Sequence, residues 1–326
     1  MNAVILCGGF GKRLAPLTNR IPKPMLSVAN RPMLSYCFDQ LGRYKIFDVT
    51  LTLAFLPEQI IKWAQGYEDF DIKFSIESTP LGTAGGVKNA IKHLSDVFVV
   101  ISGDGLSNVN LDEMIDTHLS SGADVTMAIT QSATPWLYGV VEHSDGYVKQ
   151  FLEKPKDLFG KRWINTGVYI VNKYILDYVP QNVFFDFSKD LFPRVLANGK
   201  ISIYKHNGYW NDIGDFVSYH KANMDMLKAG LYPMVNNAYH EYSTLLGKRA
   251  PSIVSNTALV AGRISGCAIQ KNCRVCSSAI LDECVVLENA IVKGRHSRCI
   301  ITDEIAIPLS EYMVDENAKF FKKSLY

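Results

Sequence analysis

The feature that most constrains the fold of this chain is its opening, where an apolar run passes directly into a glycine-rich turn that ends on basic residues. Val4–Cys7 is apolar and rich in β-branched residues, which predicts a strand. The turn contains Gly8, Gly9 and Gly11, and the cations that follow are Lys12, Arg13 and Lys23. A strand that ends in such a turn brings backbone N–H groups close to a phosphate chain. We therefore predict a triphosphate-binding loop.

The spacing of these glycines excludes two common nucleotide motifs. A dinucleotide-binding turn requires G-x-G-x-x-G, and a P-loop requires G-x-x-x-x-G-K-[ST]. The turn matches neither pattern. The opening is therefore a different kind of phosphate-binding loop.

Up to about residue 230, short β-rich runs alternate with helical segments. This alternation predicts an α/β fold with a doubly wound, Rossmann-like, mostly parallel sheet. Pro32 and Pro57 suit first helical turns. Ligands on such sheets bind beyond the carboxyl ends of the strands, so the glycine turn and Gly103-Asp104 are expected to share one crevice. The predicted strands are Val4–Cys7, Val49–Leu53, Ile72–Ile76, Val97–Ser102 and Val125–Thr130, and the predicted helices are Pro32–Leu41, Glu58–Trp63, Ala84–His93 and Leu111–Leu119.

After Pro251 the pattern changes to a six-residue step. Small or aliphatic residues recur in two columns, which are Ala261, Cys267, Cys273, Ala279, Val285 and Ile291, and Ile269, Val275, Leu281 and Leu287. This step is typical of a short β-helix with three faces per coil. We predict a catalytic domain over residues 1–232, a connector over 233–250, and a β-helix with a C-terminal tail over 251–326. The tail contains Phe320-Phe321, which we expect to pack on another surface.

Composition limits the partners and the compartment. The net charge of +2 gives no reason to expect a nucleic-acid partner. No apolar stretch approaches the roughly 20 residues of a membrane span, and the first apolar run stops at Gly8, so we expect neither a membrane anchor nor a signal peptide. The seven cysteines are expected to be reduced thiols in the cytoplasm. Although five of them lie between Cys267 and Cys299, we expect small buried residues there rather than a zinc site.

Two carboxylates in glycine-rich surroundings are candidate metal ligands. Asp104 follows a predicted strand within Ser-Gly-Asp-Gly, and Asp212 lies in Trp-Asn-Asp-Ile-Gly. Mg²⁺ binds through one or two carboxylates while it keeps waters and phosphate ligands. Asp104 could equally cap a turn, and Asp212 could end an ordinary hairpin. The sequence alone does not bring the two together.

Three further polar segments have both a structural and a functional interpretation. Leu81–Gly86 could lie flat against a nucleobase or could simply begin a helix with Thr83 as its N-cap. Glu153-Lys154-Pro155 and Asn165-Thr166-Gly167 could bind sugar hydroxyls and a phosphate, or could be solvated turns.

Together these segments resemble the sugar-1-phosphate nucleotidyltransferases, also called nucleotide-sugar pyrophosphorylases, over residues 1 to about 228. The stretch Phe185–Pro193 and the order of a catalytic domain followed by a left-handed β-helix look most like the mannose-1-phosphate guanylyltransferase branch. The matching motifs are Gly8-Gly9-x-Gly11-x-Arg13-Leu14, Pro22–Leu26, Leu81–Gly85, Gly103-Asp104, Tyr138-Gly139, Glu153-Lys154-Pro155, Asn165-Thr166-Gly167 and Trp210-x-Asp212-Ile-Gly214.

The resemblance implies that an NTP and a sugar 1-phosphate react to give an NDP-sugar and pyrophosphate. Arg13 and Lys23 would be catalytic, Arg13 at the leaving pyrophosphate and Lys23 near the α-phosphate. Asp104 and Asp212 would hold Mg²⁺. The implied nucleotide-binding set is Leu6, Gly8, Gly9, Gly11, Lys12, Pro80, Gly82, Thr83, Gly85 and Asp104, and the implied sugar-phosphate-binding set is Tyr138, Gly139, Glu153, Lys154, Asn165 and Thr166.

Two residues depart from the usual pattern of the family. Cys7 stands where Ala is usual, and Lys12 stands where a small hydroxyl residue is usual. Lys12 adds a charge near the triphosphate. A thiol beside a cationic loop is expected to be unusually acidic, and we take this as a hypothesis for Cys7.

The best prediction is a guanylyltransferase that uses GTP and mannose 1-phosphate or a related hexose or heptose 1-phosphate. The alternatives are a UTP-dependent glucose-1-phosphate uridylyltransferase and a non-catalytic regulatory subunit that binds a nucleotide-sugar. An acyltransferase with His296 as base is disfavoured because the β-helix is short. We also expect a homo-oligomer, because a β-helix end and an apolar tail favour self-association.

Overall fold

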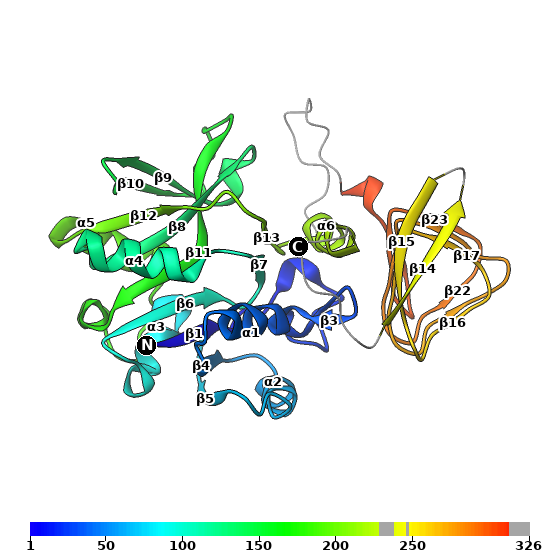
Figure 1. The fold of residues 1–326 in the computed structure, drawn as a ribbon, viewed down its shortest axis with the longest axis horizontal. Helices are drawn as coiled ribbons and strands as arrows, with labels where there is room; N and C mark the ends of the chain where they lie inside the picture. Colours follow the sequence, from blue (N-terminus) through cyan, green and yellow to red (C-terminus); the bar gives the residue numbers. More distant parts are fainter. Residues whose placement is uncertain (228–237, 246–247, 313–326) are drawn as a thin grey trace. The chain divides into compact units, whose positions relative to one another are not determined.

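The structure is a computed structural model that describes residues 1–227, 238–245 and 248–312 (Figure 1). Its contacts divide the chain into two compact units. The first comprises Met1–Gly11, Leu17–Met25 and Met33–Asp212, and the second comprises Lys12–Pro16, Leu26–Pro32 and Ile213–Tyr326. The predicted domain boundary at residue 232, part of the connector and Phe320-Phe321 lie outside the described residues.

The first unit is built on a nine-stranded mixed sheet with the order β5-β4-β1-β6-β11-β8-β12-β10-β9. The strands from β5 to β6 are parallel, whereas β11 runs antiparallel to both β6 and β8. The expected mostly parallel sheet is therefore correct for this half and for the pairing of β8 with β12, and it is wrong for the other pairings, which are antiparallel. The strands are β1 Asn2–Leu6, β4 Asp48–Leu53, β5 Asp71–Ile76, β6 Val97–Ser102, β8 Val125–Ser132, β9 Gly139–Ser144, β10 Tyr147–Glu153, β11 Arg162–Asn172 and β12 Ile201–Lys205.

The five predicted strands and four predicted helices of this unit are confirmed, with shifted ends. Pro57 begins α2 as expected, but Pro32 ends strand β3 (Arg31–Pro32), one residue before α1. The helix predicted to reach His93 ends at Asn89, and a separate 3₁₀ turn, η3, covers Ile91–His93. The other helical elements are α1 Met33–Arg43, α2 Pro57–Ala64, α3 Gly82–Asn89, α4 Leu111–Ser121, α5 Phe192–Asn198, η2 Lys23–Met25, η4 Pro135–Leu137, η5 Lys173–Tyr178 and the π-helix η6 Phe187–Leu191.

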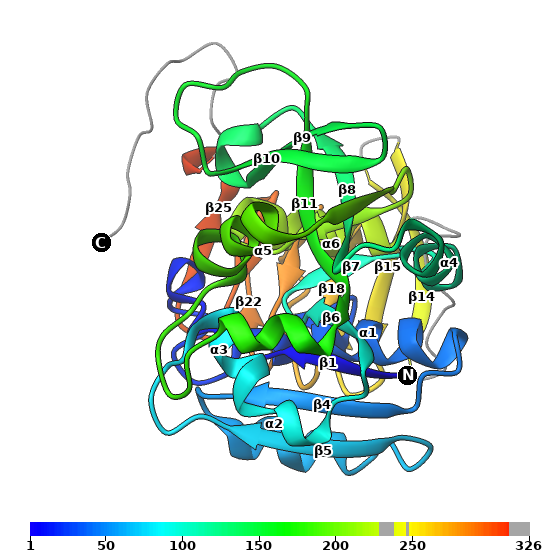
Figure 2. The same ribbon diagram turned by 90° about the vertical axis from the view of Figure 1, so that its left-hand side faces the viewer.

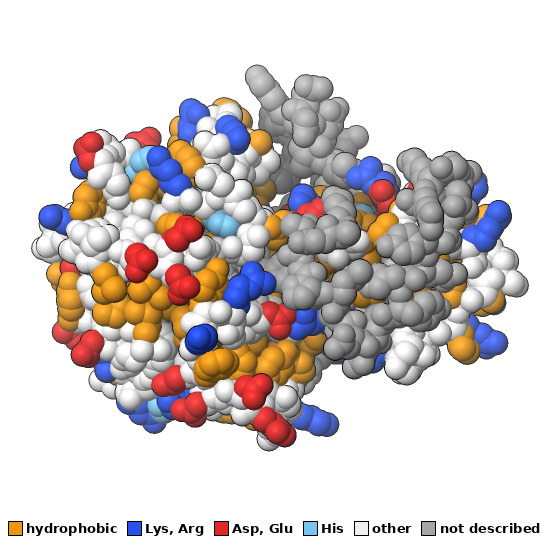
Figure 3. Space-filling view, viewed as in Figure 1, with side chains coloured by type: hydrophobic (Ala, Val, Ile, Leu, Met, Phe, Trp, Pro, Cys, Tyr) orange, Lys and Arg blue, Asp and Glu red, His pale blue; other side chains and the backbone are white. Residues whose placement is uncertain are grey.

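The sheet separates two cores because side chains alternate along each strand. On β1, Val4 joins the core under α3 and α5, whereas Ala3 and Ile5 join the core under α1, α2 and α4. Figure 2 draws α3 and α5 on one side and α1 and α4 on the other. Acidic and basic side chains are interspersed over the visible face of the first unit (Figure 3), as a net charge of +2 suggests.

The order in which the strands are added to the sheet reverses at β1. From β1 the chain proceeds outward to β4 and then β5, and it returns to place β6 on the other side of β1. In α/β sheets, ligands bind at such a reversal, beyond the carboxyl ends of the strands. The segments that follow β1 and β6 therefore define the candidate site.

The second unit contains the hairpin of β2 (Ser27–Val28) and β3, the helix α6 (Phe216–Leu227), and three sheets of short strands. Helix α6 connects these parts, since the Tyr219 hydroxyl donates to Ser27 O at 2.6 Å and His220 Nε2 lies 2.6 Å from Glu283 O. The remaining elements are η1 Lys12–Leu14, β14 Ala238–Leu245, β15 Lys248–Ser255, β16 Leu259–Val260, β17 Arg263–Ser265, β18 Ala268–Ile269, β19 Arg274–Val275, β20 Ile280–Asp282, β21 Val285–Val286, β22 Ile291–Val292, β23 Arg295–Ser297, β24 Cys299–Ile301, β25 Ala306–Pro308 and η7 Leu309–Glu311.

Successive coils of this unit pair in parallel in the orders β15-β18-β21-β24, β16-β19-β22 and β17-β20-β23. Partner residues are 15 or 17 positions apart rather than three equal steps of six. The two predicted columns are therefore only partly inward. Cys267, Cys273, Ala279, Val285, Ile269, Val275 and Leu281 are buried and Leu287 is half-buried, but Ala261 and Ile291 face outward because the unequal coils shift the register.

Within the described residues, none of the helices is long and apolar enough to cross a membrane.

Phe38 provides a test of the first core. Its ring is 1% exposed and contacts Trp63, Tyr67 and Phe70, with centroid distances of 5.6, 4.6 and 4.9 Å. Phe38→Ala should lower the free energy of unfolding by about 3–5 kcal/mol through lost burial and the resulting cavity. Leu119→Ala, at a side chain that is 65% exposed, should change it by less than about 0.5 kcal/mol. Urea denaturation measures both, and equal losses would contradict the assignment of this core.

Candidate active site

The ends of β1 and β6 touch at Gly103. The Gly103 N–H donates to Leu6 O at 3.0 Å. A Cβ at Gly103 would lie 2.8 Å from Leu6 O and 2.9 Å from Cys7 Sγ, so only glycine fits there without displacing β1. The glycine turn and Asp104 consequently lie next to each other beyond the carboxyl ends of β1 and β6, where the strand order of the sheet reverses.

An ion pair joins the first two charged residues of the site. Lys23 Nζ lies 2.5 Å from Asp104 Oδ2, and the Ser102 hydroxyl donates to Asp104 Oδ1 at 2.5 Å. The Lys23 side chain is 8% exposed and that of Asp104 is 32% exposed. Burial opposes ionisation of Asp104, but the charge of Lys23 and the hydrogen bonds from Lys23 and Ser102 outweigh it and lower the pKa of the carboxyl. Asp104 is therefore a carboxylate at neutral pH.

Pairing of two short strands brings the second predicted carboxylate to the same place. Strand β13 (Trp210–Asp212) runs antiparallel to β7 (Gly105–Ser107), and Asp212 lies opposite Gly105. Asp212 is thus beside the residue that follows Asp104. Two carboxylates at one edge form a donor set of hard oxygens, which suits Mg²⁺. Three or more His, Cys, Asp or Glu side chains do not gather as a metal site anywhere in the described part of the chain.

Lys12 and Arg13 belong to the second unit, in η1. A Cβ at Gly214 would lie 2.9 Å from Nη2 of Arg13, so this glycine leaves room for the guanidinium. The motif that contains Asp212 therefore ends on a residue that accommodates Arg13.

In the turn itself, Gly11 adopts a left-handed backbone with φ +62°. A Cβ there would lie 2.9 Å from Thr18 Cγ2, and the Thr18 hydroxyl donates to Gly11 O at 2.9 Å. A Cβ at Gly8 would lie 3.5 Å from Glu77 Oε1, whereas a Cβ at Gly9 would meet no atom within 4 Å. The turn thus presents an open backbone at Gly9.

The segment that begins α3 is clamped by the backbone of Phe185. Ala84 and Gly85 N–H both donate to Phe185 O, at 2.9 and 3.0 Å, and Phe185 N–H donates to Leu81 O at 2.8 Å. Gly82 has φ +73°, and its Cβ would lie 2.7 Å from Phe185 O. Because Gly82 and Gly85 have no side chain, they leave space for the neighbouring backbone at Phe185. A base-binding role for them stays a prediction, as it does for the exposed Pro80.

Thr83 is not the N-cap of α3. The N-cap position is Leu81, which makes no side-chain capping bond. The Thr83 hydroxyl instead donates to Asp186 Oδ2 at 2.9 Å and accepts from Phe187 N–H at 2.9 Å. The side chain therefore connects α3 to the start of η6.

A small cavity of about 140 Å³ lies beside this connection. Three of the predicted site residues line it, and these are Leu6, Thr83 and Glu153. The other lining residues are Ser102, Gly167, Tyr169, Asp186, Phe187 and Ser188.

The remaining predicted residues lie on the neighbouring strands. Gly139 pairs with Glu153 across β9 and β10, and a Cβ at Gly139 would lie 3.1 Å from Glu153 Oε2. Lys154 Nζ lies 3.6 Å from Glu153 Oε1, and Lys154 N–H donates to Tyr138 O at 3.0 Å. The Tyr138 ring packs edge-on against Trp210, with a centroid distance of 5.1 Å. This brings the Tyr-Gly, Glu-Lys and Trp-x-Asp motifs together.

Hydrogen bonds to neighbouring residues hold both Asn165 and Thr166 in place. Asn165 Nδ2 donates to the Tyr169 hydroxyl at 2.7 Å, and Asn165 Oδ1 accepts from Gly167 N–H at 2.9 Å. The buried Thr166 hydroxyl donates to Ala128 O at 2.8 Å, and Thr166 O accepts from Trp210 Nε1 at 2.9 Å. Thr166 therefore positions Trp210 and Asp212 through its backbone.

Sequence reasoning missed Ser102, Glu77 and Asp186. Glu77 Oε2 accepts from Leu81 N–H at 2.9 Å, and burial raises the pKa of its carboxyl. Gly86 leaves room for this carboxylate, since a Cβ there would lie 2.5 Å from Glu77 Oε1 and the Glu77 side chain would have to move. The position of Glu77 directly after a strand could have identified it, whereas the contact between Asp186 and Thr83, 103 residues apart, had no signal in the sequence.

The hypothesis of an acidic Cys7 is wrong. Cys7 is 1% exposed, and burial, followed by the nearby Cys37 and Asp104, raises the pKa of its thiol well above the usual value. The side chain points into the core under α1 instead of toward the cationic turn. Cys7 is thus a small apolar residue.

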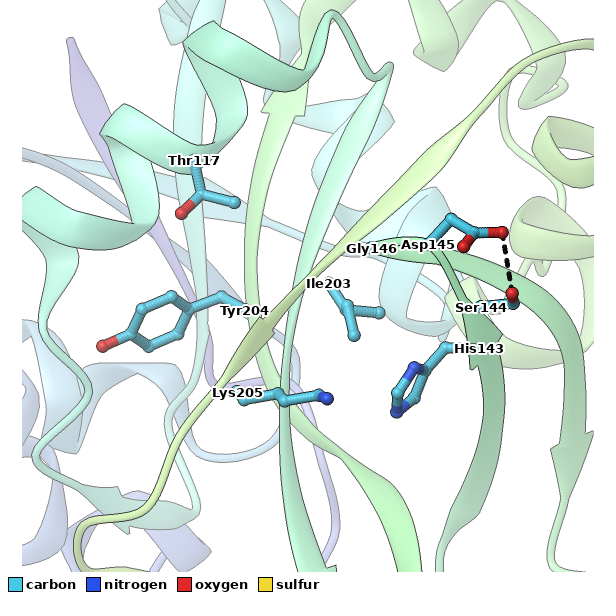
Figure 4. A pocket seen from close by; sticks show the side chains of 8 residues that line it. All are labelled: Thr117, His143, Ser144, Asp145, Gly146, Ile203, Tyr204 and Lys205. Atoms are coloured by element: carbon cyan, nitrogen blue, oxygen red, sulfur yellow. Dashed lines mark hydrogen bonds between the residues drawn. The ribbon is translucent and has the colours of Figure 1, made fainter.

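A second cavity, of about 510 Å³, lies away from these residues at the hairpin of β9 and β10 (Figure 4). Lys205 and His143 extend toward each other across it, and burial together with the charge of Lys205 lowers the pKa of His143. Ser144 donates to Asp145 at 2.8 Å on the rim. None of the predicted site residues lines this cavity.

The fold and the site define a nucleotidyltransferase. They combine a sheet whose strand order reverses at β1, a glycine turn after β1 that leads to Lys23, the carboxylate of Asp104 after β6, and Asp212 on the neighbouring strand β13. The family described as Nucleotidyl transferase matches residues 2–229, so the chain belongs to this family.

Particular relatives cover most of the chain. It is 32% identical to "Mannose-1-phosphate guanylyltransferase 1" of Arabidopsis thaliana, over 90% of this chain and 83% of the relative. It is 30% identical to "Mannose-1-phosphate guanyltransferase" of Aspergillus oryzae, over 96% of this chain and 94% of the relative. Among solved structures it resembles HddC from Yersinia pseudotuberculosis complexed with GMP-PN, with a TM-score of 0.61 and 29% identity, over 69% of this chain and 99% of that one.

Gly82→Ala tests the clamp by Phe185. Gly122→Ala is a matched control, because Gly122 has φ +60° but no atom within 4 Å of its Cβ position. The control should cost about 1–2 kcal/mol of stability through left-handed strain alone. Gly82→Ala should cost about 1–3 kcal/mol more because its Cβ also collides with Phe185 O. Equal losses in urea denaturation would show that the contact is unimportant.

Alkylation with iodoacetamide tests the burial of Cys7. Cys276 is the half-buried cysteine and the other six are buried, so Cys276 should be modified first at about pH 7.5. Peptide mass spectrometry should find Cys7 unmodified while the protein stays folded. Labelling of Cys7 at the rate of Cys276 would restore the hypothesis of a reactive thiol.

Proposed function

We propose that this nucleotidyltransferase transfers the guanylyl group of GTP to mannose 1-phosphate, with Mg²⁺, and releases GDP-mannose and pyrophosphate. The observation that carries this proposal is the clustering of Lys23, Asp104 and Asp212 beside the glycine turn. The choice of substrates is supported by two relatives named for this reaction that match at least 90% of the chain.

In the proposed reaction an oxygen of the sugar phosphate attacks the α-phosphorus of the nucleotide in line, and pyrophosphate leaves. Most of the catalysis comes from positioning and charge stabilisation. The open backbone at Gly9 would receive the triphosphate, and Lys23 would neutralise charge at the α-phosphate. Arg13 would stabilise the leaving pyrophosphate.

Asp104 and Asp212 would hold Mg²⁺, which when bound neutralises the charge of the reacting phosphates. Ser102 orients Asp104 by its hydrogen bond to Oδ1, and Oδ2, which now contacts Lys23, would be the oxygen that the metal ion binds. A single fixed carboxylate oxygen is a common Mg²⁺ ligand when waters and phosphates complete the shell.

The sugar would lie in the cavity lined by Glu153 and Tyr169. The carboxylate of Glu153 can accept hydrogen bonds from sugar hydroxyls, and the hydroxyl of Tyr169 can donate or accept them. Because Tyr169 also fixes the amide of Asn165, the two residues would act as one unit in recognition.

We further propose that the coiled strands of the second unit form a short left-handed β-helix. The supporting observation is three sheets of short parallel strands around a core of small residues, including Cys267, Cys284 and Cys299. Self-association into a homo-oligomer and a cytoplasmic location stay predictions.

Pyrophosphate release tests the function. The purified protein with Mg²⁺ is assayed with GTP, UTP, dTTP, ATP and CTP against mannose, glucose and heptose 1-phosphates. GTP with mannose 1-phosphate should be preferred, and Asp104→Asn should lower the rate by about 10²-fold or more because charge compensation is lost. Asp116→Asn, at a carboxylate on α4, should leave the rate unchanged.

Preference for UTP with glucose 1-phosphate would contradict the choice of substrates. Binding of a nucleotide-sugar without release from any pair would instead indicate a regulatory subunit. Near-normal turnover of Asp104→Asn would exclude Asp104 as a metal ligand.

A further inference from the structure

Both oxygens of the Asp104 carboxylate already have partners in the protein. Lys23 Nζ lies 2.5 Å from Oδ2, and the Ser102 hydroxyl lies 2.5 Å from Oδ1. Lys23 reaches this position from η2, and its side chain is 8% exposed. The ammonium group thus sits against the oxygen that a divalent cation would use.

We propose that Lys23 occupies the cation position at Asp104 in the nucleotide-free protein, so that a free divalent cation binds there only after a nucleotide has drawn Lys23 away. The inference deepens the proposed function and rests on its assignment of Asp104 as a metal ligand. It predicts that the metal enters together with the nucleotide and does not bind first.

Repulsion between like charges prevents the two cations from sharing Asp104. An ammonium group and a divalent cation cannot both contact one carboxylate oxygen at close range without strong repulsion, which is only weakly screened in a partly buried site. Removing Lys23 from Asp104 without a substitute leaves two poorly solvated charges unpaired, which is costly. Free Mg²⁺ pairs with Asp104 but leaves Lys23 without a counter-ion.

A nucleotide resolves this conflict because its phosphates bring negative charge. Lys23 can exchange the carboxylate of Asp104 for a phosphate oxygen, since a lysine binds phosphate as a flexible point charge. Asp104 is then available to the cation that accompanies the nucleotide. Ser102 keeps the carboxylate in place during the exchange through Oδ1.

The experiment is a titration with Mn²⁺ followed by electron paramagnetic resonance, with and without a non-hydrolysable GTP analogue. Wild-type protein alone should bind Mn²⁺ at least about 10-fold more weakly than Lys23→Met, in which the competing charge is gone. Lys73→Met is the matched control. Lys73 also contacts a carboxylate, that of Asp48 at 2.8 Å, but its side chain is 30% exposed and lies on β5. This variant should bind Mn²⁺ like the wild type.

Thermal unfolding gives a second measurement. Lys23→Met should unfold at a lower temperature than the wild type, and Mn²⁺ alone should restore part of the loss by pairing with Asp104. The double variant Lys23→Met, Asp104→Asn should lose both the tighter binding and the stabilisation by Mn²⁺.

Equal affinity of the wild type and Lys23→Met for Mn²⁺ without nucleotide would overturn the proposal. If Lys23→Met does not fold, the proposal is tested by comparing the Mn²⁺ affinity of the wild type with that of Asp104→Asn. Strong nucleotide-free binding of Mn²⁺ that Asp104→Asn abolishes would overturn the proposal. Weak nucleotide-free binding that the GTP analogue strengthens in the wild type but not in Asp104→Asn would support it. The nucleotide-free titration does not depend on turnover, so an inactive protein in the pyrophosphate assay would reject the proposed function alone.

Discussion

The close approach of β6 to β1 is the constraint on which the candidate site depends. β1 lies between β4 and β6, so the chain after β1 and the chain after β6 leave the sheet at the same edge. Gly103 permits this contact because any side chain would collide with Leu6 O and Cys7. Asp104 is therefore delivered beside the glycine turn by the backbone, and Lys23 and Ser102 then hold its charge in place.

The positions around this edge are fixed largely by backbone contacts that the predicted motifs make with neighbouring segments. Phe185 accepts from the start of α3, and Thr166 O accepts from Trp210, which precedes Asp212 by two residues in β13. These contacts use glycines and polar groups that a sequence motif presents as ligand-binding residues. A motif therefore mixes residues that touch a ligand with residues that hold the loop.

The second unit follows a different physical rule. Its short strands cannot bury an apolar face alone, so each coil depends on the next one for its core. Buried cysteines and alanines recur because little space remains inside such a narrow stack. The coil length is set by the turns, which add or omit residues, and this is why a strict six-residue step fails at Ala261 and Ile291.

By itself, the sequence determined the family, the α/β class, most strands and helices, and the residue types of the site, because period-2 and period-3.6 patterns and the glycine turn are local signals. Tertiary structure alone decided the direction of β11, the meeting of Asp104 with Asp212, the partner of Thr83 and the burial of Cys7. These features depend on which segments become neighbours although they lie far apart along the chain. Such pairings come from the packing of the whole sheet, which no local pattern encodes.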